Sequence, residues 1–178
     1  ESDQQARETA EAVARRSYGK LVAFLAARAR DVTAAEDALS DAFAAALVDW
    51  PVRGVPTSPE AWRMTVAQRE LIDAVRPRRS GEGAADHLRL VAEELEAAVA
   101  NKPQIPDERL SLMFACTHPG IERGIRAPLM LQTILGFDAA TIASAFLVSP
   151  ATMGQRLTRA KNKIRQAGIP FRVPERAD

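Results

Sequence analysis

The feature that most restricts the fold of this chain is a pair of helices, each with its own start signal, on either side of a tight turn. Asp138 is expected to begin the first helix, which runs to Phe146, and Ser149 followed by Pro150 opens the second. At about 100° per residue, the apolar side chains of the second helix share one face: Met153, Leu157, Ala160 and Ile164. The pattern predicts a helix-turn-helix that packs this apolar face inward.

The opposite side of the second helix, from Thr152 to Lys163, is polar and basic, which suits a DNA duplex. Short polar side chains and Arg reach base edges in the major groove, and Lys side chains further along position a helix on phosphates. We expect DNA-binding residues on this side at Thr152, Gln155, Arg156, Thr158, Arg159, Lys161 and Lys163. The alternative is an ordinary amphipathic helix with a solvated basic face, and the capped pair with its short turn favours DNA.

Composition indicates helices throughout the chain. Alanine is abundant, the aromatic share is only 5%, and clusters of Val, Ile, Thr and Tyr are nearly absent. We therefore expect an all-α fold of two small helical domains. No apolar run approaches the roughly 18 residues that a membrane span needs, and no signal-peptide pattern opens the chain. The single cysteine excludes an internal disulfide and fits a cytoplasmic protein.

Breakers along the chain divide it into parts. Before the first breaker we expect a helix from Tyr18 to Arg30 and a second that a capping box of Thr33 and Glu36 begins. The Pro-rich run 51–59 is expected as a loop, and Pro59 opens a third helix that ends near Arg76. The domains follow as residues 1–79, an acidic linker at 80–104, and residues 105–178.

Charge is distributed in blocks, although the net charge is only +1. Residues 31–49 hold five acids and no base, whereas residues 152–176 hold seven bases against one acid. A smaller basic cluster closes the first domain at Arg76, Arg78 and Arg79. Two basic surfaces separated by acidic stretches suggest that the chain binds a polyanion at two places. For any single charged stretch, the alternative is an ordinary solvated surface.

The third helix carries an unusual outward face. Its inward face is apolar, so Trp62, Thr65 and Arg69 point the other way. Single-stranded nucleic acid uses an aromatic ring beside arginines for stacking and backbone contact. The alternative, that Trp62 packs back onto Trp50 or the Pro-rich loop, stays open because a large aromatic side chain is normally buried.

Cys116 and His118 are the residues that come nearest to an enzyme or metal site. A metal site needs three or four ligands, and a cysteine nucleophile needs a base that the fold places beside it. The chain has neither zinc-type cysteine spacing nor a glycine-rich phosphate loop. We expect no catalysis, no metal and no cofactor, with Cys116 as a small core residue.

Three motifs in order resemble the ECF-type (extracytoplasmic-function) sigma factors of bacterial RNA polymerase. Residues Ala35–Phe43 are similar to the polymerase-docking helix of that family, Trp62–Asp73 to its −10 promoter helix, and Gly136–Arg165 to its −35 helix-turn-helix. Four segments resemble one ECF subgroup in particular: residues 107–110, 113–119, 145–148 and 159–171. Members of that subgroup usually continue into a C-terminal helical-repeat extension, which we expect to be missing here.

The resemblance implies a transcription initiation factor with no catalysis of its own. Such a factor docks on the clamp helices of the largest polymerase subunit and on the flap region, and it carries the enzyme to promoter DNA. Polymerase contacts would come from Glu36, Asp37, Leu39, Ser40, Asp41, Phe43 and Leu47. Contacts to the −10 element would come from Trp62, Thr65, Arg69, Arg76, Arg78 and Arg79. An anti-sigma factor or the missing extension would be a further partner.

The chain departs from the family pattern at several promoter-reading positions. Thr65 and Arg69 replace the Arg and Asn that many members use at the −10 element, and Gly154 stands where an Arg often reads the −35 element. The promoter sequence therefore cannot be copied from other members. A stand-alone helix-turn-helix regulator is the alternative function, and it leaves the first domain unexplained. A helical adaptor that binds only protein is a further alternative.

Overall fold

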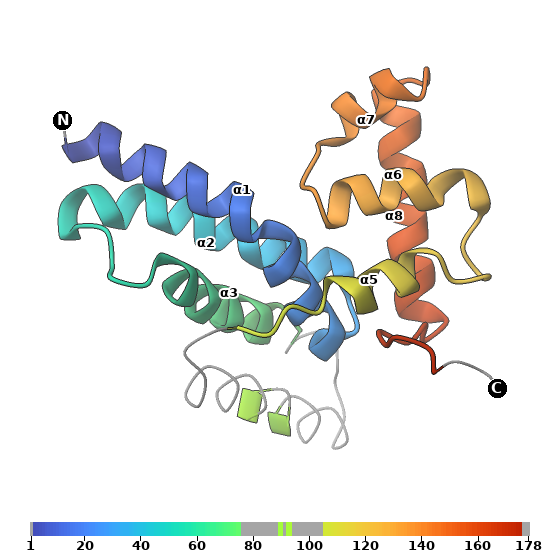
Figure 1. Cartoon of the computed structure of the whole chain (residues 1–178), viewed down its shortest axis with the longest axis horizontal. Coiled ribbons are helices and arrows are strands. Elements are labelled where there is room, and N and C mark those ends of the chain that lie inside the picture. Colours follow the sequence, from blue (N-terminus) through green and yellow to red (C-terminus); the bar gives the residue numbers. More distant parts are fainter. Residues whose placement is uncertain (1, 76–88, 91, 94–104, 176–178) are drawn as a thin grey trace.

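The computed structural model describes residues 2–75, 89–90, 92–93 and 105–175. Within these residues the chain is helical and has no strand, which confirms the all-α expectation (Figure 1). The helices are α1 (Ser2–Ala29), α2 (Val32–Arg53), α3 (Pro59–Val75), α5 (Arg109–Cys116), α6 (Arg123–Thr133), α7 (Ala139–Ala145) and α8 (Pro150–Gln166). In this described part, no helix is both long and apolar enough to cross a membrane.

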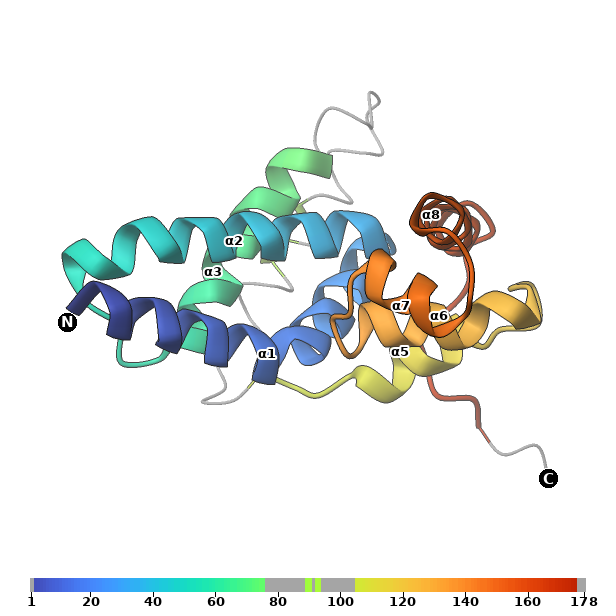
Figure 2. The same ribbon diagram turned by 90° about the horizontal axis from the view of Figure 1, so that it is seen from above.

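Helices α1, α2 and α3 form a bundle, which we call the first unit. The long helices α1 and α2 run antiparallel side by side, and α3 packs against both (Figures 1 and 2). Phe24, Leu39, Met64 and Leu71 are fully buried between them. The inward face expected for α3 is therefore confirmed at Met64, Ala67 and Leu71.

Helix α1 begins at Ser2, whereas the sequence predicted a start near Tyr18. The N-terminal half of α1 packs through alanines, and Ala6 and Ala10 are buried against Ala46 and Trp50. Alanine has high helix propensity but adds little to an apolar periodicity. The early start of α1 was therefore missed because its contact face is made of methyl groups.

The ends of α2 also differ from the prediction. The N-cap is Asp31, whose side-chain oxygen accepts a hydrogen bond from the Ala34 amide at 3.0 Å, so the predicted capping role of Thr33 is wrong. At the other end α2 includes Pro51 and continues to Arg53. Gly54, with φ of 87°, ends the helix there, and its amide donates to the Trp50 carbonyl. A left-handed conformation at this point suits glycine.

Helices α5 to α8 form the second unit, and here the start signals read from the sequence are confirmed. Asp138 accepts from the Thr141 amide at 2.7 Å, and Ser149 accepts from the Thr152 amide at 3.1 Å. Leu147, in the turn between α7 and α8, has φ of 56°. The expected inward face of α8 is buried in full: Met153, Leu157, Ala160 and Ile164.

The two units pack against each other through the C-terminal half of α1 and the start of α2. Helix α1 contacts α5 and α6, and α2 contacts α8 (Figure 2). Buried side chains of both units belong to one apolar cluster, which runs from Leu21 to Ile169. The domain boundary at 80–104 stays a prediction, since most of that acidic segment lies outside the described residues.

Candidate nucleic-acid interface

The outward side of α8 is a continuous polar and basic surface. Because the apolar face is fixed in the core, the side chains on the opposite side must face solvent. Exposed on it are Gln155, Arg156, Thr158, Arg159 and Lys163. Thr152 is half-buried, and its hydroxyl accepts a hydrogen bond from the Ser149 hydroxyl at 2.8 Å. Thr152 therefore takes part in the N-cap of α8.

Two hollows lie along this surface. An open groove of about 810 Å³ follows α8 from Ala151 to Gln166 and is lined by Gln155, Thr158 and Arg159. A smaller hollow of about 180 Å³ lies between α8 and the start of α6, where Arg156, Arg159, Lys163 and Glu122 surround it. The polar side chains along the groove and the three cations around the smaller hollow are of the residue types that contact base edges and phosphates.

Lys161 does not join this surface. Its ammonium forms an ion pair with the Glu36 carboxylate of α2 at 2.5 Å, and the two side chains are 11% and 12% exposed. The structure therefore pairs a residue predicted to bind phosphate with a residue predicted to bind polymerase. Position 161 lies one residue beyond the buried Ala160, at the border between the two faces of α8.

The residues expected to bind polymerase divide into two groups. Asp37, Ser40 and Asp41 are exposed on α2, whereas Leu39 is buried in the core and Glu36 is covered by its ion pair. Phe43 and Leu47 are half-buried, packed against the cluster around Trp50. In the arrangement described, Leu39 and Glu36 are not available on the surface of α2.

The sequence reading missed two exposed apolar residues on the same helix. Val48 is 75% exposed and Val52 is 84% exposed. They continue the exposed side of α2 at helical spacing, and we call the exposed set the α2 stripe: Asp37, Ser40, Asp41, Ala44, Val48 and Val52. Steps of four residues from Ser40 lead to Ala44, Val48 and Val52, and this spacing was the signal that would have found both valines.

Trp62 packs onto Trp50 rather than standing free on α3. The two rings meet edge to face, with centroids 5.4 Å apart and an interplanar angle of 67°. Thr65 is half-buried and its hydroxyl donates to the Ala61 carbonyl, whereas Arg69 is exposed. Of the residues expected to contact the −10 element, Arg69 is thus the exposed cation of α3. Arg76, Arg78 and Arg79 lie outside the described residues.

Arg63, next to Trp62, is a buried cation that the sequence reading did not single out. It is 1% exposed, and its Nε and Nη1 atoms have no hydrogen-bond partner in the described part of the chain. Burial lowers its pKa, while the nearby Tyr18 and Glu60 act in the opposite direction. Long side chains with charged ends are normally exposed, so an apolar periodicity alone does not predict a buried arginine.

The contacts of Cys116 and His118 indicate structural roles for both residues. The Cys116 thiol is fully buried 3.7 Å from the Thr133 hydroxyl, and burial raises its pKa to about 11. At neutral pH this thiol is protonated and a poor nucleophile. The His118 Nδ1 atom accepts a hydrogen bond from the Gly120 amide, which fixes the turn before α6. Among the described residues, no three His, Cys, Asp or Glu side chains are grouped as a metal site would require.

Among known proteins, a family model matches the first unit, whereas a relative matches most of the chain. Residues 13–81 match the family model of Sigma-70 region 2. An uncharacterized protein of Rhizobium meliloti (strain 1021) is 37% identical over 154 residues, which make up 84% of this chain and 36% of the relative. The chain thus spans about a third of the length of the curated relative that it matches. No solved structure matches it. Residues 13–81 are therefore similar to region 2 of the sigma-70 family.

Proposed function

We propose that this chain is an ECF-type sigma factor, which docks on core RNA polymerase through α2 and holds promoter DNA through α3 and α8. The observation that carries the proposal is the exposed polar and basic side of α8. It belongs to a capped helix-turn-helix in the same chain as a Sigma-70 region 2 match. A stand-alone helix-turn-helix regulator would not explain the region 2 match. An adaptor that binds only protein would not explain the basic surface of α8.

The α2 stripe supports polymerase docking. Asp37 and Asp41 supply acidic side chains at one end, and Val48 and Val52 supply exposed apolar area at the other. A partner that covers the two exposed valines removes their apolar surface from water. Burial of each valine side chain contributes at most about 1.5–3 kcal/mol to the free energy of association. The clamp helices of the largest polymerase subunit are the partner that the family resemblance suggests. The flap region would contact the second unit.

The α8 surface supports recognition of a −35 element. Gln155 is suited to adenine, and Arg156 and Arg159 are suited to guanine, if their contacts to base edges are bidentate. Gly154 has open space around it and no side chain for a base, so specificity falls to its neighbours. Lys163 and the cations around the hollow beside α6 suit the phosphate backbone.

Other parts of the proposal depend on the family resemblance alone. These are an anti-sigma factor or C-terminal extension as a further partner, a place in the cytoplasm, and the use of the 80–104 segment as a link between the two promoter contacts.

Binding to core polymerase and run-off transcription test the proposal. Val52→Asp places a charge on the α2 stripe where the side chain is 84% exposed, so the fold should be preserved. We expect this variant to lose core polymerase binding and run-off product. Val173→Asp is the matched control, because Val173 is also an exposed valine and lies outside the α2 stripe.

Equal core binding by wild type and Val52→Asp would show that the α2 stripe is not the docking surface. No core binding by the wild-type chain would reject the sigma-factor function itself. In that case, specific DNA binding without polymerase would identify a stand-alone regulator.

A further inference from the structure

The two hollows along α8 separate its polar side chains by direction. Gln155 and Asn162 line only the open groove. Arg156 lines only the smaller hollow, whereas Arg159 and Lys163 line both. Neighbouring residues of a helix point about 100° apart, so Arg156 and Gln155 face different surroundings although they are adjacent in the chain. Position on α8 therefore distinguishes side chains that residue type alone would group together.

Asn162 was not among the residues expected to bind DNA, yet it continues the direction of Gln155. It follows Gln155 by seven positions, so the two side chains point within about 20° of each other and lie roughly 10.5 Å apart along α8. That distance equals about three base-pair steps of 3.4 Å. In the described part of the chain neither amide is engaged in a hydrogen bond, so each has donors and an acceptor free for a base edge. Like Gln155, Asn162 is suited to adenine.

The groove beside these amides is open because position 154 is a glycine. No atom lies within 4 Å of the place that a Cβ of Gly154 would take. Packing therefore does not require a glycine there, in contrast to Gly19 of α1, where a Cβ would overlap the carbonyl oxygen of Ile134. Gln155 and Asn162 thus line a groove that no side chain at position 154 narrows.

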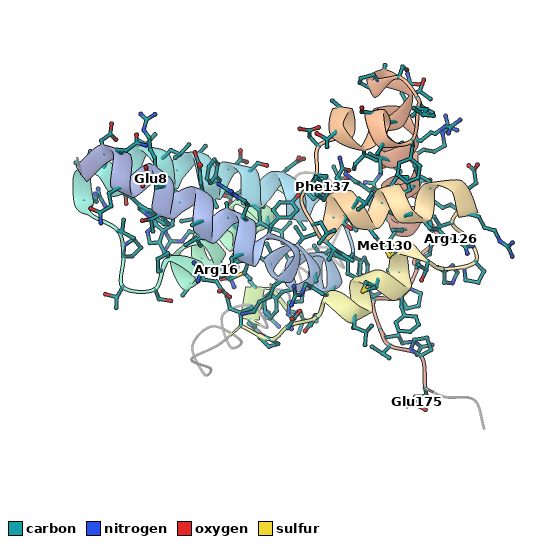
Figure 3. All side chains as sticks on the ribbon, turned by 45° about the horizontal axis from the view of Figure 1, so that its top comes forward. Glu8, Arg16, Arg126, Met130, Phe137 and Glu175 are labelled. Carbon is teal, nitrogen blue, oxygen red and sulfur yellow. The ribbon has the colours of Figure 1, made fainter. Side chains whose placement is uncertain are left out.

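The smaller hollow has fixed walls at the start of α6. Three buried apolar side chains form its floor: Ile121, Ile125 and Ala160. The Gly120 amide donates a hydrogen bond to His118 Nδ1, and Arg126 Nε donates to the Ile121 carbonyl, both at 3.0 Å. Arg126 lies toward the end of α6 that is far from the first unit (Figure 3). The hollow therefore does not depend on a ligand for its shape.

The charges around the smaller hollow favour an anion. Three cations surround it, and they are opposed by one carboxylate: Arg156, Arg159, Lys163 and Glu122. Glu122 is also the N-cap of α6, and its side chain makes no capping hydrogen bond. The first amides of α6 thus have no side-chain cap, and the start of a helix attracts negative charge. A base edge carries no net charge, so a backbone phosphate suits the hollow better.

We propose that Asn162 reads a base beside Gln155, and that Arg156 holds a backbone phosphate in the smaller hollow instead of reading guanine. The assignment rests on the proposed function, because it requires −35 DNA along α8. It orients the duplex on this helix, with base edges over the open groove and one sugar-phosphate strand along the side that faces α6. Arg159 lies at the border, since it lines both hollows.

Binding of the polymerase holoenzyme to chemically altered duplexes tests both assignments. Core polymerase with the full chain first selects −35 duplexes from a randomised pool. In a selected duplex, each phosphate is replaced in turn by an uncharged methylphosphonate, and each base pair is exchanged in turn. Fluorescence anisotropy measures the affinity of the wild type, Asn162→Ala and Arg156→Met for every duplex. The matched controls are Gln5→Ala and Arg172→Met, which change exposed side chains outside both hollows.

We expect Arg156→Met to lower the affinity for every selected duplex about tenfold, and to make the plot of log affinity against log salt shallower by about 0.9, the value for one phosphate. One methylphosphonate should weaken binding of the wild type and leave Arg156→Met unaffected. Asn162→Ala should lower discrimination at one base pair about tenfold and leave the salt dependence unchanged. Alanine has a higher helix propensity than asparagine, so that loss cannot come from a weaker helix.

Two results would overturn the assignment. If Arg156→Met is coupled to one base pair and to no methylphosphonate, Arg156 is a base reader and the hollow holds no backbone phosphate. If Asn162→Ala lowers the affinity for all base pairs alike, or for none, Asn162 is not a reader.

The proposed function can fail separately. If core polymerase does not bind the wild-type chain, the sigma-factor function is wrong, and the same duplex series is measured with the free chain. The expected couplings would then uphold the assignment for a stand-alone regulator. Absence of any duplex binding by the free chain would reject the assignment as well.

Discussion

Glu36 of α2 and Lys161 of α8 form an ion pair of 2.5 Å in which about nine-tenths of each side chain is covered. The carboxylate has a second partner in Tyr18, so both of its oxygens are engaged. Ion pairs of this kind do not necessarily add to stability compared with apolar residues, but they penalise loss of one partner. The pair therefore specifies one arrangement of the two units more than it raises their stability.

A double-mutant cycle should detect this penalty. Glu36→Gln and Lys161→Met alone should each lower the free energy of unfolding by about 3–5 kcal/mol, because each leaves a covered group without its partner. The double variant should lose clearly less than the sum of the two. Urea denaturation of the four proteins measures the coupling.

The exposed pair of Glu11 and Arg15 serves as the control for that cycle. Its atoms are 3.5 Å apart and its side chains are more than half exposed. Exposed pairs of this spacing contribute about 0.3–0.5 kcal/mol. Additive effects at Glu36 and Lys161, as small as those of the control, would contradict a specific link between the units.

On the reading face of α8, Gln155 and Lys163 should respond differently to removal. Gln155→Ala should cost about 1–3 kcal/mol of discrimination on −35 DNA and little on scrambled DNA. Lys163→Ala should lower the affinity for both DNAs alike, and it should reduce the number of counterions released on binding by about one. Fluorescence anisotropy of the polymerase holoenzyme at several salt concentrations measures both effects. Equal losses for Gln155→Ala on both DNAs would remove it as a base reader.

We expect glycine at position 147, in the turn of the helix-turn-helix, to give a more stable protein than the native leucine. Leu147 is 92% exposed and has φ of 56°, so its side chain contributes little packing and its backbone is strained. Leu147→Gly should raise the free energy of unfolding by about 0.5–1 kcal/mol, after the extra entropy of unfolded glycine is subtracted. Leu147→Ala keeps the strain and should give no gain. A gain in both variants, or in neither, would show that strain at this position does not limit stability.

Asp138 should contribute to the acid sensitivity of the second unit. Its hydrogen bond from the Thr141 amide holds the pKa of the carboxyl below its usual range. A lowered folded-state pKa gives stability that is present above the unfolded value of about 3.9 and lost as pH falls through the folded value. Asp138→Asn keeps a capping oxygen but does not titrate. We expect the free energy of unfolding of Asp138→Asn to fall less steeply than that of the wild type between about pH 6 and about pH 2.5, as measured by denaturation at each pH.

Local signals predicted the second unit well. Caps at Asp138 and Ser149 and the apolar spacing of α8 each depend on neighbours within a few residues, which a sequence displays directly. The side chains on the outward face of α8 followed from the same periodicity. Prediction was weaker for α1, since its N-terminal contacts consist of alanines that carry little periodic signal.

Contacts between segments far apart in the chain could not be predicted from the sequence alone. Periodicity assigned Glu36 and Lys161 to two different surfaces, and only tertiary packing brings them together. The same holds for Trp62, whose partner Trp50 lies on another helix and was kept open as an alternative. Arg63 was missed for a related reason, because its burial depends on tertiary packing rather than on local periodicity.

The close approach at Gly19 has a consequence for genetics. Every missense change of a glycine codon adds bulk, so each such change at position 19 should act in the same direction, whatever residue it introduces. A random-mutagenesis screen for variants with lowered stability should recover several different alleles at this codon. Most other positions should yield such alleles only for particular substitutions.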